Sequence, residues 1–579
     1  MSIKSYDTSI YELIMNTSNI FHIPIYQRSY TWEARKEVEK LIDDIMEFGE
    51  ECETNDNLEY YIGNIIVKSQ PIDISTDIIV IDGQQRITTM VIVLSAIRDI
   101  CLHKLRKERA DKFANNIARA LYHENDGKII MKVNNMEHQS ILRLILSGKL
   151  DLITDDDKQS NYYRNYKYLY SRLHQSDSRS FIKFVNLFKK IKIVQIILDH
   201  KQDENTVFES INSLGRPLSG ADLIKNYLFT FKDYSCSQEE ESDLIDLYTT
   251  KFEKLFSNEK NIPLEIQKFY RAYVAIHTSN LVKSDPKVIY YSLKKILGEI
   301  SSFGNCKRNI NDIIKWGVLY QAIRVGNIQN TNSLHIEYLR TSFNTYSILL
   351  LDLLDKTSNV EGQSVVMENS DMFNSTLKKI MGYDISRTLS GFSISEVSSI
   401  IAKVPSELKK INNQYYLNYD KEFEDFVTLT FESYQQPTIE KLRWSISNVN
   451  LFKNKNILIK LFFIVENISR KKALSFSLEK KNCRIEHIMP LSLNDEWSHI
   501  SADTHAKYVN TLGNLTITFD KINYSDYGFE RKKGLLISKS NVNINTKLSD
   551  INVFDDNSIV SRGNELLDII IDEFSIKGS

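Results

Sequence analysis

The chain contains 579 residues, of which 42% are hydrophobic, 26% charged and 11% aromatic. This length predicts three or four domains of about 150 residues each, and the composition excludes a mainly disordered or collagen-like chain. The 73 basic and 75 acidic residues leave a formal net charge of −2. That balance excludes a protein that coats nucleic acid with its whole surface, so any DNA contact must come from local positive charge.

The first part of the chain mixes helix and strand patterns. An apolar stripe predicts a helix over Glu33–Glu47, and β-rich runs predict strands over Tyr60–Lys68 and Ile78–Ile81. Ile87–Ile100 is apolar nearly all round, which predicts a buried helix. Phe184–Leu198 predicts a helix followed by a buried strand.

Two polar motifs in this part of the chain are unusual for core sequence. In IPIYQRSYTW (residues 23–32), the pair Gln27–Arg28 lies among aromatic residues. In FESINSLGRPLSGADLIKN (residues 208–226), Ser219 and Asp222 have the spacing of a capping box. Taken alone, such a capped turn is more often structural than functional.

A third motif, DGQQR (residues 82–86), lies between a predicted strand and the predicted buried helix. A strand, a glycine turn and a helix N-terminus expose backbone N–H groups that suit an anion. Arg86 could hold a phosphate with two hydrogen bonds, and Asp82 could orient Arg86 or bind Mg²⁺. An ordinary polar turn is the alternative for this motif taken alone.

The order of these motifs carries a resemblance to a known family. IPIYQRSYTW, YYIGNIIV, VIDGQQRITTM and FESINSLGRPLSGADLIKN follow one another over about residues 10–230. The set resembles the GmrS-like domain of GmrSD-type, modification-dependent (type IV) restriction enzymes, which SspE and BrxU defence proteins share. The sequence contains no Walker motif, so a P-loop is excluded as the source of any NTPase activity.

The resemblance implies a ParB/sulfiredoxin-like α+β core that binds and hydrolyses a nucleoside triphosphate, whether GTP, UTP, CTP or ATP. It also implies which residues line the nucleotide pocket. They are Tyr26, Gln27, Arg28, Asp82, Gln85, Arg86 and Thr88.

The middle of the chain, residues 231–450, is rich in helix formers and aromatic residues and has no strong β alternation. We expect a helical bundle in this region. Two segments, SSFGNCKRN (residues 301–309) and SNVEGQS (residues 358–364), are expected to be loops between helices.

The last part of the chain returns to β-like runs such as Leu515–Phe519 and ends with a helical segment that includes Gly563–Phe574. No low-complexity linker separates the regions. The sequence therefore predicts a multidomain α+β protein with regions 1–230, 231–450 and 451–579 packed together.

A second chemical motif lies in the C-terminal region. EHIMP places Glu486 beside His487 at the end of a predicted strand, and LGNLT (residues 512–516) follows. Hydrolysis of a phosphodiester needs a base to activate water, and His487 suits this task because its ordinary pKa is near neutral. The side-chain oxygen of Asn514 could hold the second ring nitrogen of His487.

The same motif offers ligands for a divalent cation. Glu486 and Asn523 would supply oxygen atoms to Mg²⁺ or Mn²⁺, and water would complete the shell. Neighbouring strand residues point to opposite sides, so Glu486 and His487 can serve one site only if the strand twists or ends there. Lys532 or Lys533 could contact the phosphate.

Together these residues resemble the GmrD-like nuclease domain of the same restriction family, over about residues 475–540. The resemblance implies a ββα-metal (HNH-type) nuclease. Asn523 stands where many such sites carry histidine, which leaves the metal preference open. His499 and His505 are expected to be surface residues in a loop-like insert.

Six basic residues and one acidic residue occur between Arg470 and Arg484, which predicts a local contact with DNA phosphates. A solvated face is the alternative.

The five cysteines are scattered without a C-x-x-C pair, which favours reduced thiols. The most apolar stretch, Ile457–Val465, is too short to span a membrane. We therefore expect a cytoplasmic protein without a membrane contact.

The leading hypothesis is an NTP-regulated, modification-dependent DNA endonuclease of antiphage defence. Its helical middle would couple the nucleotide domain to a C-terminal nickase. The alternatives are a nucleotide-dependent sensor of modified DNA with weak or ungated nicking, and a general ungated nuclease. The expected partners are double-stranded DNA, in particular modified phage DNA, and a nucleoside triphosphate. Cutting of both strands by a chain with one nuclease site favours a homodimer or two successive nicks.

Overall fold

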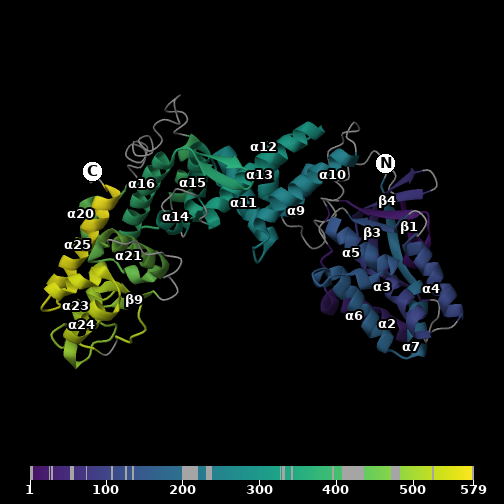
Figure 1. The fold of residues 1–579 in the computed structure, drawn as a ribbon, viewed down its shortest axis with the longest axis horizontal. Coiled ribbons are helices and arrows are strands. Elements are labelled where there is room, and N and C mark those ends of the chain that lie inside the picture. Colours follow the sequence, from purple (N-terminus) through teal and green to yellow (C-terminus); the bar gives the residue numbers. More distant parts are fainter. Residues whose placement is uncertain are drawn as a thin grey trace. The chain divides into compact units, whose positions relative to one another are not determined.

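The computed structural model divides the chain into two compact units, which are described separately (Figure 1). The first comprises Met1–Cys236 with Ile300–Cys306, and the second Ser237–Glu299 with Lys307–Ser579. The chain is mixed α and β, mostly helical and multidomain, as predicted. The three-region division stays a prediction. The structure describes residues 4–576 except 25–26, 28–29, 53–57, 73–74, 106–107, 124–126, 134–135, 199–219, 230–237, 326–327, 329–332, 341–342, 394–396, 407–435, 471–482 and 525–526.

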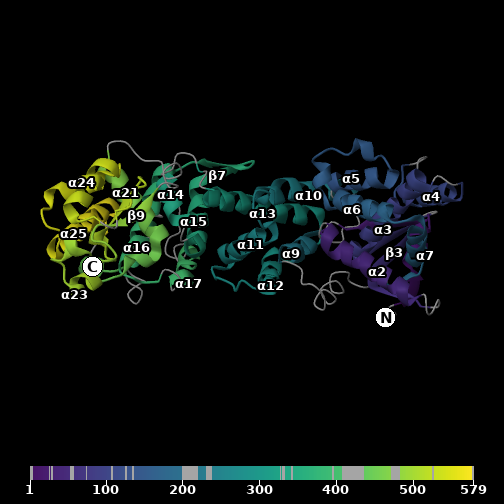
Figure 2. The same ribbon diagram turned by 90° about the horizontal axis from the view of Figure 1, so that it is seen from below.

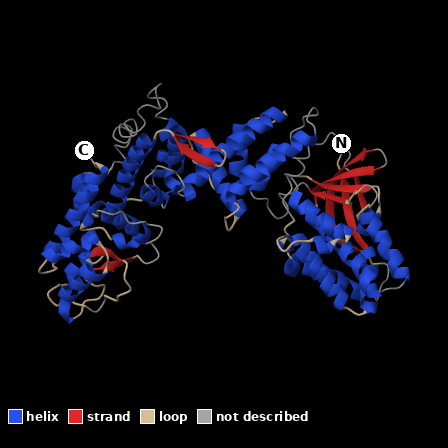
Figure 3. Cartoon of the chain, in the orientation of Figure 1, coloured by secondary structure: helices blue, strands red, loops and turns tan. Residues whose placement is uncertain are grey.

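The first unit contains a six-stranded mixed sheet, drawn in red near the N-terminus in Figure 3. Its strand order is β1-β6-β3-β4-β2-β5. The β3–β4 and β1–β6 pairs are antiparallel, and the β3–β6, β2–β4 and β2–β5 pairs are parallel. The strands are β1 (Lys4–Ser9), β2 (Asn19–Ile23), β3 (Tyr60–Ile72), β4 (Ser75–Asp82), β5 (Met131–Val133) and β6 (Ile191–Ile197).

Eight described helices accompany this sheet, and α3 and α6 lie side by side among them (Figures 1 and 2). The predicted helices and strands of this region are confirmed, with small shifts at their ends. The helices are α1 (Ile10–Met15), α2 (Glu39–Glu51), α3 (Gln84–Ile100), α4 (Glu108–Leu121), α5 (Met136–Ser147), α6 (Asn161–Gln175), α7 (Ser178–Lys189) and α9 (Gly220–Phe229).

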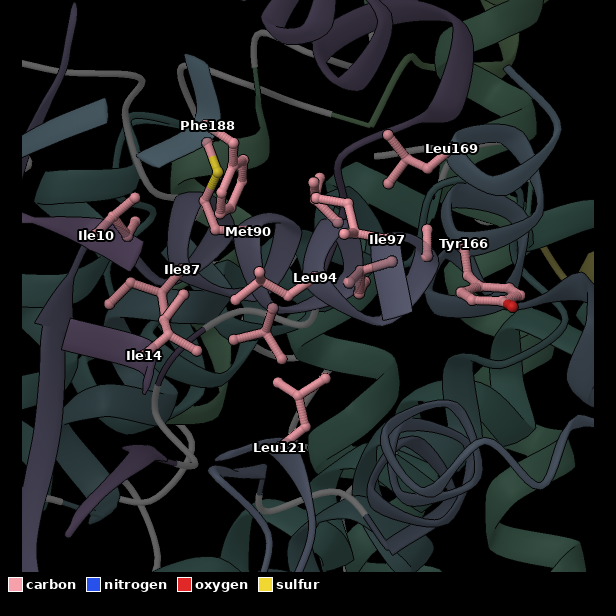
Figure 4. Close-up of a cluster of buried hydrophobic side chains, with 14 of the residues drawn as sticks. Ile10, Ile14, Ile87, Met90, Leu94, Ile97, Leu121, Tyr166, Leu169 and Phe188 are labelled. Carbon is pink, nitrogen blue, oxygen red and sulfur yellow. The ribbon is translucent and has the colours of Figure 1, made fainter. Parts of the chain in front are cut away.

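Helix α3 is the centre of the first hydrophobic core. Every residue of α3 except Arg86 is buried, which confirms the prediction from its all-round apolar pattern. Figure 4 shows Ile87, Met90, Leu94 and Ile97 of α3 among side chains from α1, α4, α6 and α7. Because α3 is packed on all sides, its N-terminus, which contains the last three residues of the DGQQR motif, has a fixed position.

The second unit is largely helical, and most of its helices from residue 238 onward are labelled in Figure 1. A helical middle region is therefore confirmed. The helices are α10 (Gln238–Asp246), α11 (Ile262–Thr278), α12 (Pro286–Leu297), α13 (Phe303–Val325), α14 (Ser333–Leu339), α15 (Phe343–Thr357), α16 (Ser370–Leu389), α17 (Ser398–Ile401), α20 (Ile439–Ile446), α21 (Lys455–Ser469), α23 (Ala502–Tyr508), α24 (Phe529–Lys539) and α25 (Asp556–Phe574).

Both loops predicted in the middle region are wrong. SNVEGQS forms most of an antiparallel hairpin of β7 (Ser358–Glu361) and β8 (Ser364–Met367), whose turn places Gly362 at φ 64°. Strands of four residues are too short to give a clear alternation. In SSFGNCKRN only the two serines precede α13, because the Ser302 hydroxyl accepts a hydrogen bond from Asn305 N and starts the helix.

The C-terminal part of the second unit contains a short antiparallel pair, β9 (Arg484–His487) and β10 (Leu515–Thr518). Helix α24 and a 3₁₀ segment, η13 (Asn543–Asp550), follow, and α25 closes the chain. The predicted β-run at 515–519 and the final helix are confirmed. Among the described residues, none of the helices is both long and apolar enough to cross a membrane.

Two glycines let the β9–β10 region approach α25. A Cβ atom on Gly513 would lie 1.8 Å from the carbonyl oxygen of Ile559, and the nearest helix residue beyond it is Gly563. Arg562 then donates hydrogen bonds to Gly513 O at 2.7 Å and Leu515 O at 2.8 Å. The loop before β10 is therefore fixed against the final helix.

Candidate active site

The C-terminal candidate site is built where β9 ends. The strand pairs Glu486 with Thr516 and His487 with Leu515, and it stops at His487. The predicted strand end is confirmed, and it is the condition under which two neighbouring side chains can serve one site. Helix α24 contributes Lys532 to the same place.

The ring of His487 is contacted by two other side chains. It is 6% exposed, its Nε2 atom lies 3.1 Å from Oδ1 of Asn510, and the ring of Phe452 is 4.5 Å away, edge to face. Burial lowers the pKa of His487, and the Asn510 contact opposes this in part. The imidazole is therefore neutral at neutral pH, as a general base requires.

Glu486 and Lys532 form an ion pair beside this histidine. Lys532 is fully buried, and its Nζ atom lies 2.9 Å from Oε1 of Glu486 and 2.5 Å from the backbone oxygen of His487. Burial lowers the pKa of Lys532, while Glu486 raises it. The two charges compensate each other, which a buried ammonium group needs.

The predicted contact between Asn514 and His487 is wrong. Asn514 is fully buried, its oxygen accepts from Met489 N at 2.6 Å, and its amide donates to Met489 O and Val509 O. Its amide oxygen and amide nitrogen therefore both bind backbone groups and not the His487 ring. Asn510, four residues earlier, contacts the ring instead, and the sequence alone gave no reason to prefer it.

Both lysines that were predicted to contact phosphate have partners within the protein. Lys533 Nζ donates to Ile551 O and to Glu530, and Lys532 has the two partners described above.

The two described basic residues of the segment 470–484 also have partners within the protein. Arg470 pairs with Glu466, Arg484 donates to Asp520 O and Ile522 O, and the lysines at 471, 472, 480 and 481 lie outside the described residues.

Two further histidines were expected at the surface of a loop-like insert. His499 is exposed, as predicted. His505 is not in a loop: it lies on α23, is half-buried, and its Nε2 atom is 2.8 Å from Pro490 O. The helix begins after Ser501, whose hydroxyl accepts a hydrogen bond from Thr504 N at 3.1 Å.

The donor atoms at this site suit Mg²⁺ or Mn²⁺. Glu486 gives one carboxylate oxygen to Lys532, and no partner of the other oxygen is found in the described part of the chain. Asn523 is exposed. No group of three or more His, Cys, Asp or Glu side chains that could hold a metal is found within the described ranges.

The N-terminal candidate site joins two of the predicted motifs. Gln27 donates from Nε2 to Ile81 O at 2.7 Å, and Oε1 of Gln85 accepts from Thr31 N at 2.9 Å and from Trp32 N at 3.3 Å. The segment IPIYQRSYTW is thereby fastened to the junction of β4 and α3. Tyr26 and Arg28 lie outside the described residues.

The DGQQR turn has the expected geometry. Gly83 is in the left-handed region at φ 89°, where a Cβ atom would lie 2.7 Å from the side chain of Ile65. Arg86 donates to Asn64 O at 2.8 Å, and Asp82 is half-buried at the end of β4. Thr88 is directed away from this turn, since it is 3% exposed and its hydroxyl contacts Sδ of Met131.

Buried hydrogen bonds stiffen this site from behind. The Tyr30 hydroxyl lies 2.7 Å from Oγ1 of Thr89 on α3, and Asn165 on α6 donates to the same hydroxyl and to Trp32 O. Sequence reasoning missed Asn165, which is fully buried and 135 residues from Tyr30. No local pattern could have connected the two.

Two family models match the chain, and each covers the residues of one candidate site. The chain matches the N-terminal domain of the GmrSD restriction endonuclease over residues 10–229 and the C-terminal domain of the GmrSD restriction endonucleases over residues 419–569. The two matches define a modification-dependent restriction endonuclease, an enzyme that acts on DNA. They cover more than half of the chain between them, and the chain belongs to the GmrSD restriction endonuclease family. A search of curated proteins finds no match.

Proposed function

We propose that this chain is an NTP-regulated, modification-dependent DNA endonuclease of antiphage defence that nicks DNA at a ββα-metal (HNH-type) site. The observation that carries the proposal is the buried His487 at the end of β9, beside Glu486 and Lys532; burial lowers the pKa of His487. This group lies within the matched C-terminal restriction endonuclease domain. A base, a carboxylate and a cationic side chain at one place suit phosphodiester hydrolysis.

The reaction follows from the placement of these residues. His487 accepts a proton from water as the water oxygen bonds to phosphorus, and the bond from phosphorus to the leaving 3′ oxygen breaks. Glu486, with Asn523, would hold Mg²⁺ or Mn²⁺, which when bound stabilises the charge on the phosphate and leaving oxygens. Lys532 fixes the position of Glu486 and the backbone of His487.

The N-terminal unit would bind the nucleoside triphosphate at the DGQQR turn. The N-terminus of α3 suits a phosphate, and Arg86 is the residue of α3 that is not buried. Gln27 and Gln85 hold the neighbouring segment in place. Bound nucleotide would then bias the nuclease through a second conformational state.

A cleavage panel tests the whole proposal. Glucosylated, methylated, phosphorothioate and unmodified DNAs are each incubated with the full chain, Mg²⁺ or Mn²⁺, and GTP, UTP, CTP, ATP or no nucleotide. We expect nicking of at least one modified DNA that depends on nucleotide and metal. Equal cutting of unmodified DNA without nucleotide would support an ungated nuclease, and nucleotide-dependent DNA binding without cutting would support a sensor.

Replacing Arg86 with alanine tests the nucleotide site. We expect NTP hydrolysis to fall on the order of 100-fold, because a positioned cationic donor to the phosphates is lost. The measurement is phosphate release by the full chain. Arg119→Ala on α4 is the matched control, since Arg119 is exposed and contacts only its own helix. Undiminished hydrolysis by Arg86→Ala would contradict the proposed pocket.

A further inference from the structure

The two ring nitrogens of His487 have different surroundings. Nε2 lies 3.1 Å from the side-chain oxygen of Asn510. Within the described ranges Nδ1 has no hydrogen-bond partner, and it is not among the unpartnered side-chain atoms sealed from solvent. An amide oxygen can only accept a hydrogen bond, so the neutral ring carries its proton on Nε2 and keeps a lone pair on Nδ1.

Asn510 is itself held by a segment outside the EHIMP and LGNLT motifs. Its backbone oxygen accepts a hydrogen bond from Leu451 N at 3.0 Å. The next residue, Phe452, packs its ring 4.5 Å from the His487 ring, and Lys455 Nζ lies 4.2 Å over Phe452. One short turn, η9 (Leu451–Asn454), therefore contacts both the histidine and its hydrogen-bond partner.

We propose that Asn510 is the positioning residue of the nuclease, which selects Nδ1 of His487 as the atom that receives the water proton. The inference deepens the proposed function and rests on it. Asn510 would act through His487 in two ways: its oxygen fixes the ring orientation before the reaction, and it stabilises the imidazolium that forms when Nδ1 is protonated. The η9 turn keeps the pair in register.

The protonation pattern is measured directly on the full chain. Histidine labelled with ¹⁵N is incorporated, and His487→Gln identifies the signals of the His487 ring. At a pH where the ring is neutral, we expect the wild-type protein to show a protonated Nε2 and an unprotonated Nδ1. Asn510→Leu is expected to shift the ring toward a mixture of the two forms. A wild-type ring protonated on Nδ1 would overturn the inference, whatever the enzyme cleaves.

The catalytic consequence is measured with bis(4-nitrophenyl) phosphate and with supercoiled plasmid, both with Mn²⁺. Asn510→Leu is expected to lower kcat about 10- to 100-fold with KM nearly unchanged, because a partner of the base and not of the substrate is lost. Asn510→Asp, which still accepts from Nε2, should keep most of the activity. The control is Asn557→Ala, an exposed residue on α25.

The outcomes separate this inference from the proposed function. If His487→Ala cuts at the wild-type rate, the assignment of the base fails. If His487→Ala is inactive while Asn510→Leu cuts at the wild-type rate, only the role of Asn510 fails. If Asn510→Leu unfolds, Asn510→Asp and the wild-type ring signals still test the role of Asn510. An Asn510→Asp variant as inactive as His487→Ala would contradict positioning through Nε2.

Discussion

His487→Ala is expected to abolish DNA cleavage, with a loss of about 10²- to 10⁴-fold in rate, the usual contribution of a positioned general base. Nucleotide hydrolysis should remain measurable, since the proposed nucleotide site belongs to the other compact unit. The measurement is nicking of the DNA that the wild-type chain cuts, alongside phosphate release. His499→Ala is the control, because His499 is exposed.

The pH dependence of cleavage is a second test of His487 as the general base. Burial is the main reason that the pKa of His487 lies below its ordinary value of 6.5. A general base works in its neutral form, so the rate should persist below pH 6.5 and fall only as the pH drops through the lowered pKa. An acid limb well above pH 6.5, or a His487→Ala enzyme that cuts at the wild-type rate, would contradict this role.

Gly513→Ala is expected to be the most damaging small substitution in the nuclease region. Its Cβ atom would lie 1.8 Å from the carbonyl oxygen of Ile559, and backbone atoms of α25 cannot move aside without shifting the helix. We expect a loss of about 1–3 kcal/mol or more in the free energy of unfolding. Cleavage should fall as well, because the displaced loop carries Asn514, which supports the backbone after His487.

Gly534→Ala is the matched control for this substitution. Gly534 is exposed on α24, and no atom lies within 4 Å of the position its Cβ would take. Alanine favours a helix interior over glycine, so this variant should be about 0.5–1 kcal/mol more stable. Denaturant unfolding of both variants measures the difference. Equal stability of the two would show that the loop can move away from α25 at little cost.

Local patterns predicted much of the fold. The all-round apolar run predicts α3, β-rich runs predict β3 and β4, and the apolar run that follows a predicted helix predicts β6. The β7–β8 hairpin was missed because four-residue strands hold too few alternating positions. The start of α13 within SSFGNCKRN was missed because Ser302, which directly precedes the helix and caps it, outweighs Gly304.

At the candidate sites the sequence predicts the local features but not the contacts between distant segments. The strand end at His487 and the positive φ of Gly83 follow from Pro490 and from the Asp-Gly turn, which act locally. The choice between Asn510 and Asn514 depends on how the chain folds between α23 and β10. The partner of Lys532 depends on α24 packing against β9, a contact between segments 46 residues apart, which no spacing rule reveals.

The ion pair between the buried Lys532 and the half-buried Glu486 bears on whether the fold depends on a metal. Because the ammonium group already balances the carboxylate inside the fold, the site needs no metal to keep its charges compatible. Structural zinc sites are the opposite case, since those domains unfold when the metal leaves. If cleavage uses Mg²⁺ or Mn²⁺ as proposed, removal of the cation should therefore stop cleavage and leave the protein folded.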